Sequence, residues 1–282
     1  MTLEAFVERP LSVAAALDRG ECRGTYVEAY LVIAGAIRGL ASFAWPGTNR
    51  DRARFVEAWI RFGTTSHPTA MRISLPLLIE SMFARAAAHE RDYEQALRAE
   101  ANARRPEDAR RAGDDSMRAS ADARRTTAQA RALQRLRPRV FRPSNSCLAI
   151  SGDDVDVGED EVLARCPGLG RRHVRQFSYP VVFYEHVRSQ MVHEYQLGHR
   201  AAAYPTSTRA SAGVSYSNIN GKRNILFPVD WLISLTRTIA RGIDSTAPDG
   251  RLPTPEAWWV NAGPPRPQRR RRGRAQDVGR AT

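Results

Sequence analysis

One short segment, from Tyr184 to Tyr195, carries the residues best suited to chemistry. It reads YEHVRSQMVHEY and places Arg188 five residues before His193. Histidine titrates near neutral pH and can take or give a proton, while a guanidinium holds a phosphate through paired hydrogen bonds. Cleavage of RNA without a metal needs a base for the 2′-OH, an acid for the leaving oxygen and a cation on the phosphate. The sequence therefore predicts that Arg188 and His193 act together on RNA.

The periodicity of this segment places the pair on a helix. Phe183, Val187, Met191 and Tyr195 keep i, i+4 spacing, which predicts a helix with these residues in the core. A separation of five residues is about 140° on an ideal helix, so one helix points the two side chains in neighbouring but distinct directions. Two copies related by a two-fold axis would bring both pairs into one cleft, so we expect a homodimer.

Neighbouring residues are candidates for supporting roles, and a structural alternative stays open. Ser189 follows the arginine directly, and His186 lies seven residues before His193, on the same face of the helix. We interpret both as supporting residues, although an exposed position without a role is equally open for His186. For Arg188 and His193, the alternative to a catalytic role is a purely structural one, with the arginine on the surface and the histidine in the core.

Helical periodicity and turn signals predict the elements around this segment. Together they indicate a mainly α fold with a small β-hairpin. The predicted elements are helices over 24–44 and from 51, an apolar segment over 73–83 interrupted by Pro76, a helix over 177–200, a hairpin over 214–227 around Asn220-Gly221 and a helix opened by Pro228.

Two parts of the chain differ in composition from the predicted helical domain of 1–84 and 138–247. Residues 85–137 are rich in alanine, arginine and acids, which indicates a solvated helical hairpin or a partly disordered insert; because alanine and arginine form helices well, we expect exposed helix. RNA contact is open there, but a run of mixed charges is usually a solvated face. Residues 248–282 form a tail that we expect to be disordered, and its basic run would add non-specific affinity for nucleic acid. That run is Arg269, Arg270, Arg271 and Arg272.

The net charge and the pattern of cysteines indicate the broad class of protein and its compartment. The formal net charge is +13, and Lys222 is the single lysine. An arginine bias of genomic origin and attraction to polyanions both explain this charge. The three cysteines form no paired motif, the first residues predict no signal peptide, and Glu28 and Arg38 interrupt the most apolar stretch. We therefore expect a cytoplasmic protein without a membrane span.

No pattern in the sequence predicts a metal or a cofactor. There is no P-loop, dinucleotide fingerprint or zinc spacing. The acids Asp153, Asp154 and Asp156 lack the spacing of a calcium loop, so we interpret them as a surface loop or a helix cap.

The motif and several other segments resemble one family. Arg188 and His193 form R-x4-H on a late helix, which resembles the signature of HEPN domains, and the other similar segments suggest a plasmid- and phage-associated branch. The resemblance covers roughly residues 20–84 and 170–245. The segments that carry it are Tyr26–Tyr30, the Trp45-Pro46-Gly47 turn, Asp51–Phe55, Val192–Tyr195, Ser215–Asn218 and the closing helix.

The resemblance implies a fold and an activity. It implies a helical bundle, a homodimer and a metal-independent endoribonuclease, with Arg188 and His193 as catalytic residues and a role as a toxin or in phage defence. Ser189 departs from the Asn, Asp or His that often follows the arginine in the family. Tyr195 matches a tyrosine that a partner nucleotidyltransferase adenylylates in some toxin–antitoxin pairs, so an antitoxin is an expected partner.

Two other functions compete with the ribonuclease. One is a non-catalytic HEPN-like module that binds RNA, a nucleotide or a protein; burial of the motif would favour it. The other is a helical interaction protein whose basic tail binds nucleic acid non-specifically.

Overall fold

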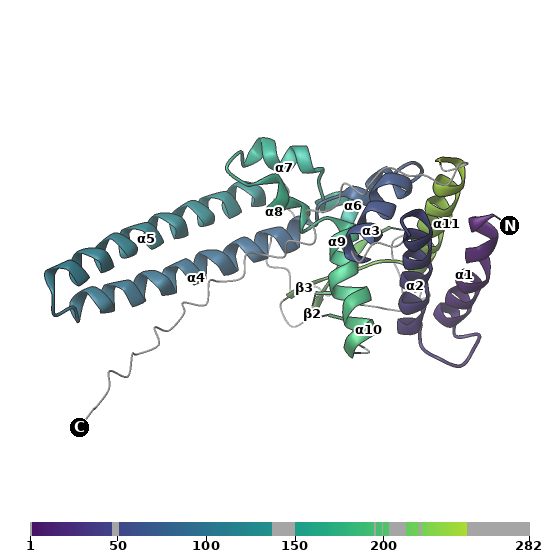
Figure 1. Cartoon of the computed structure of the whole chain (residues 1–282), viewed down its shortest axis with the longest axis horizontal. Coiled ribbons are helices and arrows are strands. Elements are labelled where there is room, and N and C mark those ends of the chain that lie inside the picture. The colour runs from purple at the N-terminus through teal and green to yellow at the C-terminus, as the bar shows by residue number, and fades with distance from the viewer. Residues whose placement is uncertain are drawn as a thin grey trace, which may run out of the picture.

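A computed structural model describes residues 2–46, 51–136, 150–194, 196–198, 200–202, 213–219 and 222–246. The described chain is mostly helical and carries a small antiparallel sheet, which confirms the predicted mainly α fold with a β-hairpin. Figure 1 shows a compact body from which a long two-helix arm projects. The α-helices are α1 (Leu3–Arg19), α2 (Tyr26–Ala44), α3 (Asp51–Ala58), α4 (Leu75–Ala101), α5 (Pro106–Gln134), α6 (Gly152–Val155), α7 (Glu159–Arg165), α8 (Arg171–Arg175), α9 (Tyr179–Phe183), α10 (Gln190–Glu194) and α11 (Val229–Thr246). The other elements are the π-helices η1 (Trp59–Gly63) and η3 (Tyr184–Ser189), the 3₁₀-helix η2 (Pro68–Met71), and the strands β1 (Ile150–Ser151), β2 (Ser215–Ile219) and β3 (Lys222–Leu226).

Aromatic side chains form the centre of the body. The rings of Trp59, Phe183 and Phe227 are almost completely buried, and Phe183 lies 5.3 Å from Trp59 and 5.2 Å from Phe227 between ring centroids. Tyr30 of α2 donates a hydrogen bond to the Phe227 carbonyl at 2.8 Å. These contacts join α2, η1, α9 and the segment before α11 into one core.

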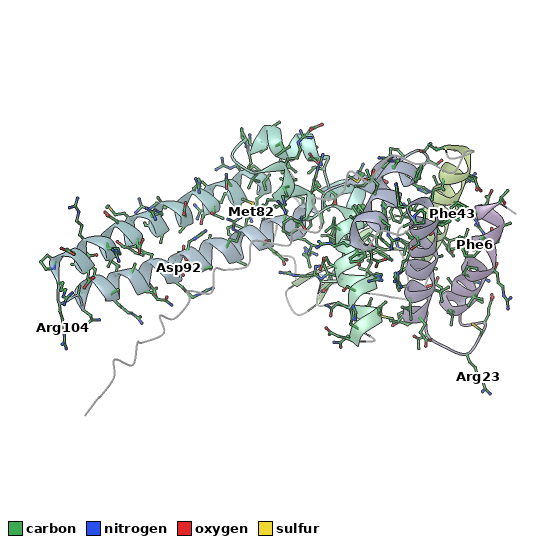
Figure 2. All side chains as sticks on the ribbon, viewed as in Figure 1. Phe6, Arg23, Phe43, Met82, Asp92 and Arg104 are labelled. Atoms are coloured by element: carbon green, nitrogen blue, oxygen red, sulfur yellow. The ribbon has the colours of Figure 1, made fainter. Side chains whose placement is uncertain are left out.

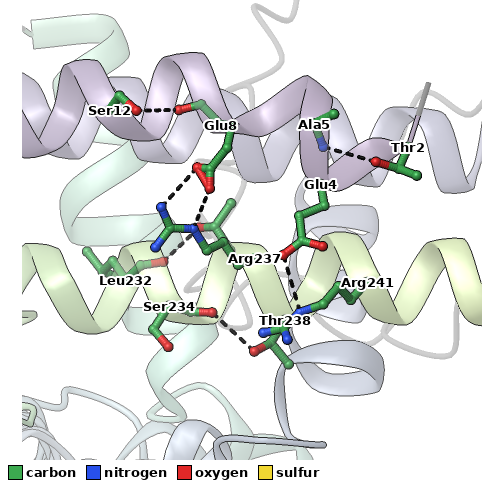
Figure 3. Close-up of polar contacts among 11 residues, drawn as sticks. Thr2, Glu4, Ala5, Glu8, Ser12, Leu232, Ser234, Arg237, Thr238 and Arg241 are labelled. Atoms are coloured by element: carbon green, nitrogen blue, oxygen red, sulfur yellow. Dashed lines mark hydrogen bonds and ion pairs between the residues drawn. The ribbon is translucent and has the colours of Figure 1, made fainter.

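The N-terminal helix α1, which was not predicted, completes the body. Leu3, Val7 and Leu11 are buried at helical spacing, so the signal for it is present in the sequence. Figure 3 shows how α1 lies along α11: both carboxylate oxygens of Glu8 accept hydrogen bonds from Arg237, at 2.8 and 2.9 Å. This two-pronged ion pair fixes α1 in register with α11.

The arm consists of α4 and α5, which run antiparallel (Figure 1). The expectation that Pro76 interrupts an apolar segment is wrong: Pro76 lies in the first turn of α4, where its missing N–H leaves no hydrogen bond unmade. Because α4 continues across residue 85, the predicted insert does not begin at a structural boundary. The expectation of exposed helix over 85–137 is confirmed for α4 as far as Ala101 and for α5 from Pro106 to Gln134, with a turn over 102–105 between them.

Small side chains let the two arm helices lie close together. The buried residues of α5 are spaced by three, four or seven positions, as in a coiled-coil seam. Leu133 then joins Leu78, Val162 and Val174 in a second small core, where α7 and α8 cover the base of the arm (Figure 1). The small buried seam residues of α5 are Ala112, Ser116, Ala123, Thr126 and Ala130.

The sheet has the order β1-β2-β3, and all its pairs are antiparallel. The hairpin of β2 and β3 is confirmed, with Ser215 opposite Leu226; its predicted turn at 220–221 lies outside the described residues. The strand β1 was not predicted, because a two-residue strand carries no detectable alternation.

A buried carboxyl group connects the sheet to the helices. Asp153 and Asp154 are exposed, as predicted, but the expectation of a surface position is wrong for Asp156, which is 3% exposed. Asp156 accepts hydrogen bonds from the hydroxyls of Tyr179 and Tyr216 at 2.5 and 2.6 Å. Burial raises the pKa of Asp156 to about 7, and the tyrosine hydrogen bonds oppose that shift.

The apolar helix α2 meets the length and composition of a membrane span, and half of its most apolar window is buried inside the body. A core helix of a water-soluble protein passes the same test, so this helix alone is weak evidence for a membrane. The cytoplasmic location stays a prediction.

We predict that the Asp156→Asn substitution changes how stability depends on pH. An unfolded aspartate has a pKa of about 3.9, so between about pH 4 and pH 7 the native state holds a proton that the unfolded state has lost. The free energy of unfolding contributed by Asp156 therefore falls as the pH rises through this window. Urea unfolding of wild type and Asp156→Asn at several pH values measures it.

The difference between the two proteins separates the contribution of Asp156 from those of His67 and His173, whose pKa values burial lowers. The two histidines contribute stability that rises with pH, the opposite sign. Parallel pH profiles for wild type and Asp156→Asn would contradict the prediction.

Candidate functional site

The motif lies on a helix whose middle turn is a π-helix. α9, η3 and α10 follow one another without a break from Tyr179 to Glu194. The predicted helix over 177–200 is therefore too long at both ends. The wider turn of η3 contains Arg188, so the angle expected for an ideal helix does not hold between Arg188 and His193. Single π turns of this kind occur frequently at functional sites.

Arg188 is held by two partners at once. Its guanidinium pairs with the Asp51 carboxylate at 2.7 Å and donates a hydrogen bond to the Tyr184 hydroxyl at 3.1 Å. The same hydroxyl donates to Asp51 at 3.0 Å, which closes a triangle of three side chains. The guanidinium carbon also lies 4.9 Å from the centre of the Tyr184 ring, and burial raises the pKa of Tyr184 to about 12. Only 9% of the Arg188 side chain is exposed.

Asp51 lies within ion-pair distance of more arginines than one carboxylate can neutralise. Besides Arg188, the Arg38 Nε lies 3.0 Å from Asp51 and an Arg54 nitrogen 3.7 Å from it. Arg52, the next residue after Asp51, pairs with Glu185 of η3 at 2.8 Å. Four arginines thus meet two carboxylates, which leaves two positive charges in what we call the Asp51 cluster. It comprises Arg38, Asp51, Arg52, Arg54, Glu185 and Arg188.

The Asp51 cluster combines an exposed edge with a buried interior. The Arg38 side chain is 55% exposed, whereas those of Arg52 and Arg54 are 17% and 12% exposed. The Nε groups of Arg52 and Arg54 are buried and have no hydrogen-bond acceptor in the part of the chain that the structure describes. Burial lowers the pKa of Arg52, and the charge of Glu185 opposes this shift. Such donors favour an anion, since an unpaired buried donor is costly.

His193 has a different environment from Arg188. It lies near the end of α10 and is exposed, as are Val192 and Glu194. Within the described residues no hydrogen bond joins Arg188 to His193, so a single chain does not bring the predicted pair into direct contact. The structure therefore presents a fixed arginine and a histidine that is accessible to solvent on consecutive turns.

The structure describes two of the three predicted supporting residues. These two, Ser189 and His186, are half-buried. The His186 carbonyl accepts a hydrogen bond from the Gly198 N–H at 2.7 Å, and a side chain at Gly198 would come within 3.0 Å of His186 backbone atoms. The chain after α10 therefore turns back along the helix instead of extending it. Tyr195 lies outside the described residues, as do Arg269, Arg270, Arg271 and Arg272.

Sequence reasoning missed the partners of Arg188. The sequence placed Asp51 only at the start of a predicted helix, and Tyr184 only at the start of the motif segment. The i, i+4 spacing of Tyr184 and Arg188 is a local signal for their contact. No local signal joins Asp51 to Arg188, because 137 positions of sequence separate them and only the packing of α3 on η3 brings them together.

Within the described residues, no three side chains of His, Cys, Asp or Glu converge as metal ligands would. Comparisons with protein-family models, curated proteins and solved structures find no match to this chain. The HEPN resemblance stays an expectation that rests on the residues themselves.

We predict that Arg188 and Asp51 are strongly coupled in stability. A double-mutant cycle with Arg188→Met and Asp51→Asn, measured by urea unfolding, should give a coupling free energy of about 1–3 kcal/mol, since the pair is largely removed from water. The matched control is Arg125 and Asp122 on α5, an exposed i, i+3 pair expected to give about 0.2–0.5 kcal/mol. Equal coupling in both cycles would show that the triangle does not hold Arg188.

Proposed function

We propose that this chain is a metal-independent endoribonuclease of the HEPN type, with RNA phosphate bound at the Asp51 cluster and His193 transferring the proton. The observation that carries the proposal is the convergence of three guanidinium groups on the Asp51 carboxylate; one of them, Arg188, lies on the same continuous helix as the exposed His193. The surplus positive charge supports an anionic ligand, and the histidine supports acid–base chemistry near neutral pH.

The proposed reaction is an internal transfer at phosphorus. The 2′-oxygen of the ribose attacks the adjacent phosphorus while the bond from phosphorus to the 5′-oxygen breaks, which leaves a 2′,3′-cyclic phosphate and a 5′-hydroxyl. A base takes the proton of the 2′-OH, and an acid protonates the departing 5′-oxygen. His193 is suited to either role because it is exposed and titratable.

The arginines stabilise the extra charge on the phosphate during this reaction. Arg38, whose side chain is 55% exposed, would meet the phosphate first, and Arg188, which is 9% exposed, would contribute its charge from the interior of the cluster. No protein group in this scheme requires a metal or a cofactor.

One histidine cannot be base and acid in the same step, which is the chemical reason to propose a homodimer. An isologous pair would supply two copies of Arg188 and two of His193 to a shared cleft. The remaining expectations belong to the same proposal: a cytoplasmic toxin or phage-defence effector, an antitoxin partner, and modification of Tyr195 by a nucleotidyltransferase.

A second candidate is a HEPN-like module that binds RNA or a nucleotide without cutting it. The burial of Arg188 favours this function, because a guanidinium that is 9% exposed and already paired with Asp51 has few donors left for a substrate. In this candidate the Asp51 cluster still binds an anion, but His193 transfers no proton.

We predict that the purified full chain cleaves a mixed RNA pool in the presence of EDTA, and that His193→Ala slows cleavage by at least about 100-fold, the usual contribution of a general acid or base. Denaturing gels give the rate, and end analysis should find 2′,3′-cyclic phosphates. His89→Ala on the arm is the matched control and should keep the wild-type rate.

The outcomes separate the two candidates. Equal cleavage by wild type and His193→Ala would remove His193 from the mechanism. RNA binding by wild type without cleavage, lost when Arg38 and Arg54 are replaced by Gln, would favour the binding module.

A further inference from the structure

Helix α2 presents an apolar face to solvent. Half of its most apolar window is buried inside the body, and the other half is not. Phe43 of α2 is 64% exposed, and Phe6 of α1 is 50% exposed. A side chain at Gly39, one turn before Phe43, would come within 3.7 Å of the Phe6 ring, so the two phenylalanines border one surface. Figure 2 shows both at the end of the body that lies away from the arm.

This face contains both a knob and a hole of matching size. Phe43 is a large side chain that projects from α2. In the two turns before it, four small or medium-sized residues at positions i, i+3, i+4 and i+7 surround a hole. A side chain at Gly35 would meet no other atom within 4 Å, so the hole is open. Between packed helices, a knob inserts into a hole of this four-residue kind on the facing helix. The hole residues are Val32, Gly35, Ala36 and Gly39.

We propose that two copies of this chain associate through α2, with the helices antiparallel and Phe43 of each copy inserted in the hole of the other. Phe43 follows Gly39 by four residues, and the hole is centred about four residues before Gly39. A two-fold axis beside Gly39 therefore places each knob opposite the partner's hole. Since α1 and α2 form a helical hairpin with Phe6 beside Gly39, the two copies of Phe6 meet near the same axis.

The size of the face suits a dimer. Helix α1 has 17 residues and α2 has 19, so the hairpin is roughly 25 Å long and roughly 20 Å wide. Each copy offers on the order of 500 Å², and a pair would bury on the order of 1,000 Å², about the minimum for a specific interface. The knob and the hole contain no charged side chain, so their contact removes no ion from water.

The antiparallel arrangement would join the two candidate sites. A two-fold axis that passes between antiparallel helices, perpendicular to both, keeps each flank of the pair on its own side. Figure 1 shows α1 and α3 on opposite flanks of α2, and Arg38 pairs with Asp51 at the start of α3. Both Asp51 clusters would thus line one side of the α2 pair, with the two copies of Arg38 near the axis. The interface is inferred from the shape of the helices, whereas this shared groove rests on the proposed function.

The test measures the oligomeric state of the purified full chain by sedimentation equilibrium and by light scattering after size exclusion. We predict that wild type is a dimer and that Phe43→Glu raises the dissociation constant at least about 100-fold, because each dimer loses two central contacts and would bury two charges. Met117→Glu on the arm is the matched control. Met117 is 66% exposed but lies outside the face, so this variant should dimerise like wild type.

The Gly35→Leu substitution separates a shaped interface from general apolar adhesion. A leucine here has room in the single chain and a higher helix propensity than glycine, so the protomer keeps its fold, which circular dichroism and urea unfolding check. The leucine fills the hole that receives Phe43 of the partner copy. The dissociation constant should therefore rise at least about tenfold, as overpacking predicts, whereas general adhesion would strengthen.

Several outcomes would overturn the proposal. They are a monomeric wild type, which would leave this face to a different protein, a dimer that Phe43→Glu leaves intact, and a dimer that Gly35→Leu strengthens. A monomeric Phe43→Glu variant that cleaves RNA at the wild-type rate would contradict the shared groove. A dimer that both substitutions disrupt, in a chain that never cleaves RNA, would support the interface while the ribonuclease proposal fails.

Discussion

The Asp51 carboxylate is the point on which the candidate site depends. It lies at the start of α3 and binds Arg38 of α2, Arg54 of its own helix and Arg188 of η3. These arginines would repel one another without it, so a single charge holds three helices at fixed positions. The carboxylate neutralises only one of the three, so a surplus of positive charge remains at the site.

The aromatic core fixes the geometry beneath this polar layer. Phe55, one turn after Asp51, stacks with Phe183 at 6.2 Å and meets the edge of Tyr184 at 5.3 Å. Tyr184 in turn binds both Asp51 and Arg188 through its hydroxyl. The position of Arg188 therefore follows from the packing of α3 on the π turn. The aromatic core thus fixes the orientation of Arg188, and the Asp51 carboxylate balances its charge.

Local patterns predicted several of the longer elements of this fold, whereas non-local contacts determine its site. The helix that carries Arg188 and His193 and the β2–β3 hairpin follow from periodicity and turn residues. Asp51 and Asp156 could not be assigned in the same way, because the partners of each lie on elements distant in sequence. Pro76 was misjudged for a different reason: its effect depends on whether it begins a helix or interrupts one, and the apolar run alone does not fix that point.

What the net charge of +13 does depends on where the arginines lie in the structure. In the body they converge on carboxylates contributed by other elements, as at Asp51, and there they fix tertiary structure. On the arm some of them pair within their own helix, as Arg125 does with Asp122, which balances charge there. A genomic bias towards arginine would add cations without regard to place, whereas these two arrangements differ by element. At the Asp51 cluster four arginines meet two carboxylates, and this surplus of positive charge is what favours an anionic ligand.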